Sequence, residues 1–462
     1  MLLLLPLSLA ASYDSLEVGG PWGTPTSTDG SAPWWNPAGV AMDDGLRMTG
    51  ELAYTWGGNT FQRTGAKAGD AEMTGGSPVP FAGLSYTTPG GFGVGTALAI
   101  PYATGGDESY RGSNAYFTRR SSIVAAYAIL SAAYRPTDRV SFGLSVAGVS
   151  STMSSISDQD TVPDLHATLA AMGEESPYTD QDLEREEYAA IIELKELSDT
   201  ALTVGGGLQA WLTPNALFGV SFWRGYEVQN EGDIVMHFSC PPESDTVGRF
   251  GAESRGICHQ NIEGGVRSTY TIPHRASAGL AVFPQPWTRV EVMGGWVGWS
   301  VQQDIQVDIY GVAANNPEMD PSAAALMERS TVKARDLQDS WWGGLDVKHE
   351  LPGERLLVGG RVLYDTAAVP TDSMNPSNAD FDSLMLSGLV ALTLPPSARG
   401  GTWQLSLSGT HYVQASRTVT NSRYSMSLDE QRLPEERYQA PSANGTYTGS
   451  KERVAIALRT SF

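Results

Sequence analysis

The chain has 462 residues, 51 of them glycine, and a formal net charge of −21. This charge excludes a nucleic-acid-binding protein, which needs a basic surface, and no internal run of about 18 apolar residues is present to form a transmembrane helix. The mean hydropathy of −0.20 still allows a membrane β-barrel, because lipid-facing and lumen-facing residues alternate along its strands and cancel in any average.

The N-terminal end has the pattern of an export signal. Residues 1–10 read MLLLLPLSLA and are followed by the small residues Ala11 and Ser12, which suit signal peptidase. The usual basic start is missing, and a buried core segment is the alternative. We expect residues 1–11 to be a truncated signal peptide and the mature chain to be an integral protein of the outer membrane of a Gram-negative bacterium.

From residue 47 onwards, segments of about ten residues alternate apolar side chains with small or polar ones, as the strands of a membrane barrel do. In the last segment Val454, Ile456, Leu458 and Phe462 share one face, with Arg453 on the other. We predict fourteen such strands. They span residues 47–57, 79–88, 91–101, 122–134, 139–152, 201–212, 216–230, 272–284, 287–300, 339–350, 354–366, 382–395, 401–416 and 451–462.

The connections between these strands alternate between short and long. Those after even-numbered strands are short and rich in proline, glycine and asparagine, whereas those after odd-numbered strands reach 48 residues at 153–200. Outer-membrane barrels have this parity, with short periplasmic turns and long extracellular loops. An even number of antiparallel strands also closes without an exposed edge. The sequence therefore predicts an all-β fold, a 14-stranded antiparallel transmembrane β-barrel.

The longest loop, 153–200, has two segments with helical spacing of apolar residues. The first contains Val162, Leu165, Leu169 and Met172, and the second contains Leu183, Tyr188, Ile191, Ile192 and Leu197. Between Met153 and Thr200 stand 13 acidic residues against Arg185 and Lys195, as in a solvated loop. We expect two amphipathic helices at the outer mouth, which either pack on the barrel rim or form a groove for a hydrophobic ligand.

A second long loop, near 231–271, contains the two cysteines of the chain, Cys240 and Cys258. In an exported protein such an even pair usually forms a disulfide. His237 and His259 lie near them, but there is no Cys-x-x-Cys pair, so a zinc site is the weaker interpretation. We expect a disulfide, no metal and no cofactor.

The segment before the first strand contains Asn36-Pro37-Ala38. Here the chain resembles the FadL/TodX family of outer-membrane transporters for long-chain fatty acids and other hydrophobic compounds. In that family an N-terminal hatch holds an Asn-Pro-Ala motif and fills a fourteen-stranded barrel. Residues 273–300, which end in Trp-Ser, and 360–388, which begin GRVLYDTAAVP, resemble later segments of the family in the same order.

The resemblance implies that residues 12–46 form a hatch inside the barrel of residues 47–462. It also implies passive transport of hydrophobic small molecules, fatty acid-like or hydrocarbon, which leave sideways through a gap at an inward kink of the third strand. Because glycine weakens strands and permits bends, Gly91, Gly93 and Gly95 are candidates for the kink, although barrels are rich in glycine in any case.

Several residues are candidate ligand contacts. By strand parity Arg275, Arg289 and Arg361 point into the lumen, where they would either meet a ligand carboxylate or pair with acidic side chains. The hatch residues Trp34 and Trp35 would line the pocket or merely plug it. The hatch motif itself suits a fixed turn, because proline fixes φ and asparagine readily caps.

Other classes of function remain open on the sequence. A water-filled porin for small hydrophilic solutes is one alternative, disfavoured by the hatch, and a surface receptor or adhesin is another. An enzyme would need a nucleophile with a histidine in reach, and only His411, near Ser408 and Thr410, offers this, without an acidic partner in the sequence. We expect a non-enzymatic monomer whose partners are a hydrophobic ligand (or bound detergent) and outer-membrane lipid.

Overall fold

A computed structural model describes residues 16, 18, 19, 23–65, 67, 69–108, 112–254, 260–328, 330–351, 353, 355–395, 401–428 and 441–462. The predicted signal peptide, residues 1–11, lies outside the described residues. So does Cys258, and the disulfide therefore stays a prediction. Among the described residues, none of the helices has the length and apolar character of a membrane span.

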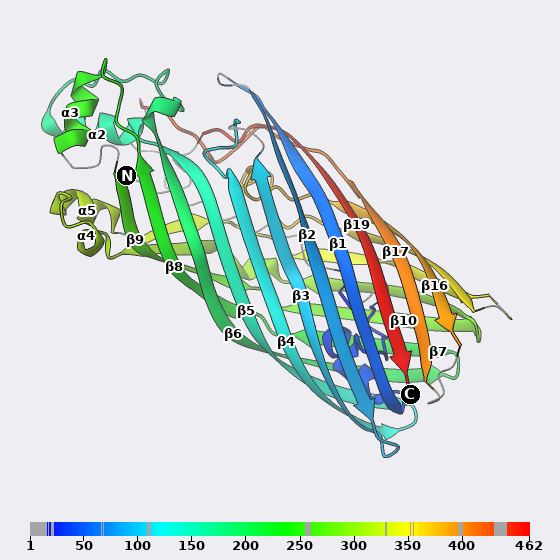
Figure 1. Ribbon diagram of the computed structural model, residues 1–462. Coiled ribbons are helices and arrows are strands. Elements are labelled where there is room, and N and C mark those ends of the chain that lie inside the picture. Colours follow the sequence, from blue (N-terminus) through cyan, green and yellow to red (C-terminus); the bar gives the residue numbers. More distant parts are fainter. Residues whose placement is uncertain are drawn as a thin grey trace.

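The described strands form one antiparallel sheet that closes on itself (Figure 1). The strands of the first half are β1 (Gly45–Arg63), β2 (Gly69–Thr87), β3 (Phe92–Glu108), β4 (Arg120–Thr137), β5 (Val140–Asp160), β6 (Ala189–Thr213), β7 (Ala216–Trp223), β8 (Tyr226–Phe238), β9 (Asn261–Ile272) and β10 (Arg275–Gln285). Those of the second half are β11 (Thr288–Val297), β12 (Asp304–Tyr310), β13 (Ser330–Ala334), β14 (Ser340–Glu350), β15 (Leu356–Asp365), β16 (Ser383–Leu394), β17 (Thr402–Gln414), β18 (Arg417–Val419) and β19 (Gly445–Ser461).

These segments occupy fourteen positions around the barrel, as predicted. Five positions each hold two consecutive segments with a short interruption: β7 with β8, β9 with β10, β11 with β12, β13 with β14, and β17 with β18. For example, β6 pairs with β7 at one end and with β8 at the other. The last strand pairs with the first from Arg47 opposite Ser461 to Arg63 opposite Gly445, and this ladder closes the barrel.

The outer face of the barrel is apolar, as lipid contact requires. Leu144 and Leu202 are 71% and 75% exposed, and Leu98, Leu130 and Leu407 are each more than 60% exposed. Their sequence neighbours point inward and all but Ala201 are buried, because side chains alternate along a strand. Leaving so many leucines in water would be costly at about 25 cal/mol per Å², so a hydrocarbon phase is the environment that suits this surface.

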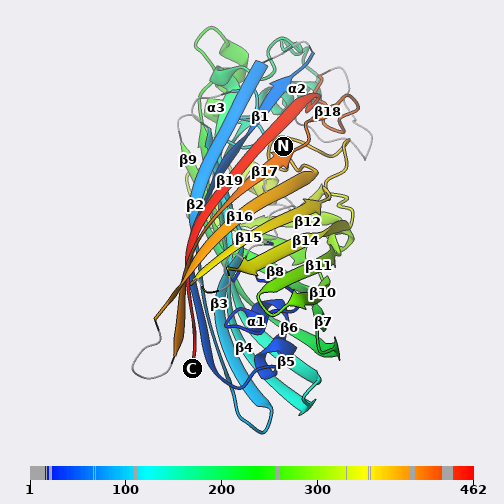
Figure 2. The same cartoon turned by 90° about the vertical axis from the view of Figure 1, so that its right-hand side faces the viewer.

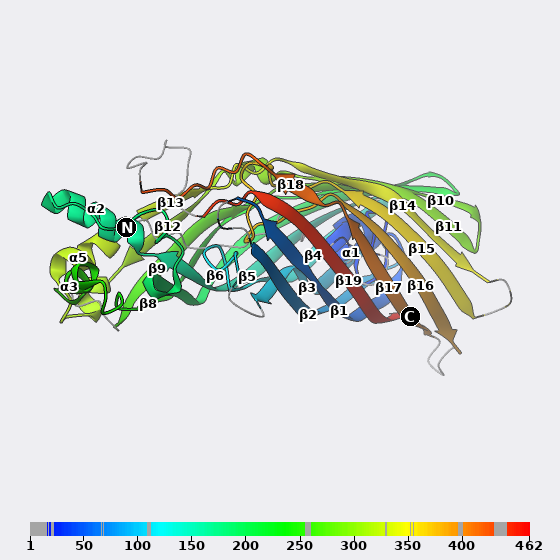
Figure 3. The same ribbon diagram turned by 90° about the horizontal axis from the view of Figure 1, so that it is seen from above.

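Short helices lie at the two ends. Inside the barrel are α1 (Ala32–Trp35) and the 3₁₀ helix η2 (Pro37–Ala41); at the long-loop end are α2 (Val162–Met172), η3 (Glu186–Tyr188), α3 (Thr246–Ser254), α4 (Val312–Asn315) and α5 (Pro321–Met327); η4 (Trp299–Val301) follows β11. Helix α2 has a proline in its first turn and ends at Gly173 in the left-handed region (φ 75), as helix termini favour. Figures 2 and 3 show α1 enclosed by strands, away from α2 and α3.

The structure corrects the prediction for the longest loop. Helix α2 confirms the first helical segment, but the second is wrong, because residues from Ala189 belong to β6 and pair with β5 up to Asp160. The apparent helical spacing has a local cause. The register shifts near Glu196, which has a positive φ of 48, so that Ile192, Leu194 and Leu197 are all buried. The loop is therefore 161–188, and strands β8 and β9 likewise extend into 231–271.

Candidate transport site

The N-terminal segment is packed against a part of the wall made of small residues. A methyl group added to Gly143 would lie 2.3 Å from the carbonyl carbon of Pro37, and one added to Gly207 would lie 2.1 Å from Oδ1 of Asn36. Such distances are far inside van der Waals contact, so only glycine lets the two backbones approach this closely. The glycines on the inner face of β5 and β6 therefore make room for the hatch.

Two of the three candidate kink glycines, Gly93 and Gly95, have the same role, and the kink of the third strand stays a prediction. A methyl group on Gly93 would lie 3.0 Å from the carbonyl oxygen of Val40, and one on Gly95 would lie 2.9 Å from Cγ of Pro33. Both residues lie in unbroken ladders with β2 and β4. Gly91 precedes β3 in the turn, with a positive φ of 77.

Asn36 joins three backbone segments at the centre of the hatch. Its Oδ1 accepts a hydrogen bond from the backbone N–H of Ala38 (3.1 Å) and so caps η2, while Pro37 stands at the first helical position. Its Nδ2 donates to the carbonyl oxygens of Pro25 (2.9 Å) and of Leu208 in β6 (3.1 Å). The motif thus ties the hatch both to itself and to the wall.

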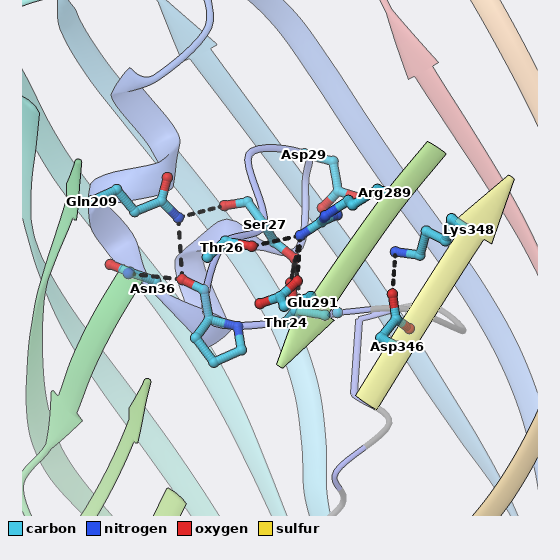
Figure 4. Close-up of polar contacts among 12 residues, drawn as sticks. Thr24, Thr26, Ser27, Asp29, Asn36, Gln209, Arg289, Glu291, Asp346 and Lys348 are labelled. Atoms are coloured by element: carbon cyan, nitrogen blue, oxygen red, sulfur yellow. Dashed lines mark hydrogen bonds and ion pairs between the residues drawn. The ribbon is translucent and has the colours of Figure 1, made fainter. Parts of the chain in front are cut away.

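Gln209, the wall residue next to Leu208, completes this contact. Its Nε2 donates to the carbonyl oxygens of Pro25 (3.2 Å) and Ser27 (3.0 Å), as Figure 4 shows. Asn36 and Gln209 are fully buried. In such surroundings an unpaired carbonyl group would cost about 1–3 kcal/mol. The Asn36 and Gln209 side chains therefore satisfy backbone groups that an extended segment inside a barrel would otherwise leave unpaired.

On the other side of the hatch the wall is charged (Figure 4). Arg289 donates through Nη2 to the hydroxyls of Thr24 (2.9 Å) and Thr26 (2.6 Å) and to Glu291 (2.6 Å). Arg361 donates through Nε to Asp346 (3.1 Å) and through Nη2 to the carbonyl oxygen of Gly23 (3.2 Å). These two arginines point inward as predicted, but they bind the hatch.

Further ion pairs extend this patch. The Nζ of Lys348 lies 3.7 Å from Asp346, and the Nε of Arg459 lies 3.3 Å from Asp29 of the hatch. The extended part of the hatch is thus held by charge-assisted hydrogen bonds and ion pairs, which are stronger than neutral ones. The helical part is instead held by close backbone packing and the Asn36 contact.

Aromatic side chains and Arg275 cover Trp34 of the hatch. The guanidinium of Arg275 lies 3.6 Å from the ring centroid of Trp34 and donates to its carbonyl oxygen (3.3 Å). Tyr127 meets the same ring edge-on at 5.5 Å, and Trp223 lies 5.9 Å away. Trp34 is 1% exposed, so it plugs the barrel under these neighbours.

Trp35, the second tryptophan of the hatch, is also buried. Its Nε1 donates to the carbonyl oxygen of Val18 (2.5 Å), and its ring packs edge-on against Trp342 at 6.3 Å between centroids. A buried indole N–H with a backbone partner and a ring neighbour is a packing contact. Trp35 therefore connects two parts of the hatch and the wall.

The barrel wall is interrupted between β2 and β3. Thr74 pairs with Asp107 and Ala82 pairs with Leu98, but residues 75–81 and 99–106 between these points do not pair with each other. On its other edge β3 shifts register against β4 between Ala99 and Tyr102. We call the unpaired stretch, 75–81 with 99–106, the β2–β3 break.

Three prolines explain the break, and the sequence prediction missed them. Pro78 and Pro80 lie in β2, and Pro101 lies at the register shift of β3. Proline cannot donate to a ladder and is found in sheets only at edges and bulges. The β1–β2 ladder runs unbroken through both β2 prolines, so the missing donors face β3. A proline inside a predicted strand is the sequence feature from which the break could have been predicted.

Two cavities meet at the break. One of about 440 Å³ runs from Trp56 and Gly76 to Ser377, Ala379 and Gln414. The other, of about 790 Å³, opens on the outer, lipid-facing side of the wall and is lined mainly by apolar and small residues of β2 to β6, such as the exposed residues Leu98, Ala128 and Leu202. Both are lined by Ile100. Of the predicted ligand contacts, Trp34, Trp35 and the three arginines line neither cavity.

The hydrolase arrangement considered from the sequence does not assemble. His411 is exposed on the outer face, where its Nδ1 lies 2.5 Å from Glu452, whereas Ser408 and Thr410 are buried on the inner face. Thr410 shares a hydrogen bond with Ser387. The alternation along β17 separates the histidine from both hydroxyls.

No protein-family model matches the chain, and no curated protein matches its sequence. Solved structures do match. A Pseudomonas aeruginosa FadL homologue has a TM-score of 0.76 at 13% identity, covering 98% of both chains. The chain therefore has the FadL-like barrel fold. The Pseudomonas putida toluene transporter TodX (TM-score 0.66, 12% identity, 98% of this chain and 99% of that chain) and the Ralstonia pickettii toluene transporter TbuX (0.63, 14%, 98% of both) are also similar.

Proposed function

We propose that this protein carries hydrophobic small molecules passively across the outer membrane and releases them sideways into the bilayer through the β2–β3 break. The observation that carries the proposal is the break itself, with the 440 Å³ cavity that joins its outer rim to residues of the barrel interior. The FadL-like fold, shared with two toluene transporters, supports the same class of cargo.

The position of the break suits lateral exit. On its outer side Trp56 stands opposite Gly76, and Trp56 stacks on Tyr54 with 6.0 Å between ring centroids. Aromatic residues on a barrel's outer face mark the boundary of the hydrocarbon region. A molecule leaving through the break therefore enters the bilayer next to this boundary.

The energetics also favour a sideways route. The hatch blocks the direct path to the short-turn end, the periplasmic end of such barrels. A molecule with about 200 Å² of apolar surface would lose roughly 5 kcal/mol on entering periplasmic water. Lateral exit keeps that surface covered, so passive transport needs no energy source. A porin for hydrophilic solutes would need the path that the hatch fills.

The proposal is tested by restoring the missing donors. The triple variant Pro78→Val, Pro80→Val, Pro101→Thr allows the β2–β3 ladder to close, and Pro136→Ala, at the exposed end of β4, is the matched control. We expect intact bacteria with the triple variant in their outer membrane to take up a radiolabelled monoaromatic hydrocarbon at the rate of cells without the protein. Uptake equal to that of the wild type would refute lateral release.

A further inference from the structure

The 440 Å³ cavity at the break is bounded on its inner side by two loops that fold into the barrel. One is the β3–β4 loop, whose residues 114–118 are all buried. It is fixed by backbone hydrogen bonds from Thr118 to Asn114 (2.9 Å) and from Arg119 to Ile156 (2.7 Å). The other is the β15–β16 loop, which contributes Ser377 and Ala379.

Thr118 is unusual among the residues that line this cavity. Its side chain is 0% exposed, and among the described residues no group donates to or accepts from its hydroxyl. Asn114, one turn earlier, is 1% exposed, and its side-chain amide is likewise without a partner in the described part of the chain. Buried polar groups in native proteins are nearly always hydrogen-bonded, so each exception needs an explanation.

The free-energy cost of burying the unpaired Thr118 hydroxyl indicates that this group has a function. Replacing an unpaired buried hydroxyl by a methyl group of the same shape is expected to be neutral or stabilising. Other hydroxyl-bearing residues surround the same space: Thr74, Ser77, Ser121, Ser122 and Ser377. The cavity thus offers groups that both donate and accept, next to the apolar 790 Å³ cavity that shares Ile100.

We propose that the Thr118 region is a recognition subsite for a neutral hydrogen-bonding group, such as a hydroxyl or ketone, on an otherwise apolar molecule. The polar group binds at Thr118 while the apolar body extends past Ile100 towards the 790 Å³ cavity. This inference rests on the proposed function. Within the hydrophobic cargo it adds a preference for neutral, singly oxygenated compounds over bare hydrocarbons, because a bare hydrocarbon leaves the Thr118 hydroxyl unpaired.

The charged residues of the cavity favour a neutral group over a carboxylate. Arg120 is paired with Asp107 (2.9 Å), both on the exposed side. Lys451 lies over the ring of Tyr412, 4.4 Å from its centroid. These cations already have partners, whereas the buried hydroxyl of Thr118 suits an uncharged donor or acceptor.

The test compares an n-alkane, the primary alcohol, the methyl ketone and the carboxylate of one chain length. Uptake is measured in intact bacteria that carry wild type, Thr118→Val, Thr118→Ser or, as control, Thr402→Val, which removes an exposed hydroxyl that does not line either cavity. We expect Thr118→Val to reduce alcohol and ketone uptake about three- to tenfold, the effect of one neutral hydrogen bond, with alkane uptake unchanged. Thr118→Ser and Thr402→Val keep the wild-type ratios.

Thermal unfolding of the purified variants separates recognition from folding, since Thr118→Val is expected to be at least as stable as wild type. An unchanged alcohol-to-alkane ratio, or an equal loss for all four compounds, overturns the proposal. A selective loss of carboxylate uptake overturns it in favour of an anionic cargo. If wild-type cells take up none of the compounds faster than cells without the protein, the proposed transport function itself fails.

Discussion

Removing the Asn36 side chain should release the hatch without unfolding the barrel. In Asn36→Ala the hatch loses the bonds to the carbonyl oxygens of Pro25 and Leu208 and the cap on the N–H of Ala38. A neutral hydrogen bond contributes about 0.5–1.5 kcal/mol and an N-cap about 1 kcal/mol, so docking weakens by roughly 2–4 kcal/mol. Asn36→Asp is of equal size but places a carboxylate against two carbonyl oxygens, and we expect a larger effect.

The assay is single-channel conductance in planar bilayers. A loss of roughly 2–4 kcal/mol raises the undocked fraction of the hatch about 30- to 1,000-fold, so open events absent from wild type should appear in Asn36→Ala and more often in Asn36→Asp. Asn215→Ala, in the exposed turn between β6 and β7, is the control and should stay silent. If both Asn36 variants were as silent as wild type while correctly inserted, Asn36 would not be the anchor that its contacts indicate.

Two further predictions concern the wall and the outer loops. Gly207→Val places its side chain where Asn36 Oδ1 lies, at 2.1 Å from the new Cβ, whereas the neighbouring Gly206→Val faces outward; conductance should appear only in the former, and silence in both would contradict the packing described. Burial raises the pKa of Asp160 to about 6, against hydrogen bonds from Glu184 and Val162 that lower it. Because the folded form then holds its proton more tightly than the unfolded chain, this group makes the 161–188 loop less stable as pH rises from about 4 to about 6, by roughly 2–3 kcal/mol at most. The protection factor of the Glu184 amide, which is the intrinsic exchange rate divided by the measured rate at each pH, should fall over that range in wild type and stay constant in Asp160→Asn. The same pH dependence of the protection factor in both proteins would contradict the prediction.

The sequence was sufficient to predict the barrel because two independent regularities coincide. Alternation along Val454, Ile456 and Leu458 predicts one apolar face, and short connections after every second strand predict fourteen antiparallel positions. Strand length was underestimated. Beyond the lipid-facing band the outward residues become polar, as Thr60 and Gln62 of β1 do, so the strands continue where the apolar alternation ends.

The site was predictable only in part. Inward parity placed Arg289 and Arg361 correctly in the lumen, but parity gives no depth along the barrel, and both contact the hatch. The helical spacing around Ile192 came from a register shift that one strand's sequence cannot reveal. From the sequence the wall opening was expected at glycines, but Gly93 and Gly95 make room for the hatch. The prolines Pro78, Pro80 and Pro101 were the residues that indicated the position of the break.

The subsite at Thr118 had no signal in the sequence. A single threonine in a loop is normally predicted to be solvated. The hydroxyl of Thr118 is buried without a partner only because residues 114–118 fold into the barrel. The arginines were interpreted as ligand contacts for the same reason. The partner of a buried polar group depends on contacts between distant segments, and the sequence alone does not show those contacts.

The central claim is that apolar cargo leaves through the wall between β2 and β3. The most direct measurement is the position at which an apolar photoreactive hydrocarbon, supplied to intact bacteria, becomes attached to the protein. The account predicts labelling of Val79, Ile100 and Pro101, which line the cavity at the break. The account would be contradicted if the label were found on Thr24, Thr26 and Ser27, which lie on the path through the hatch to the short-turn end.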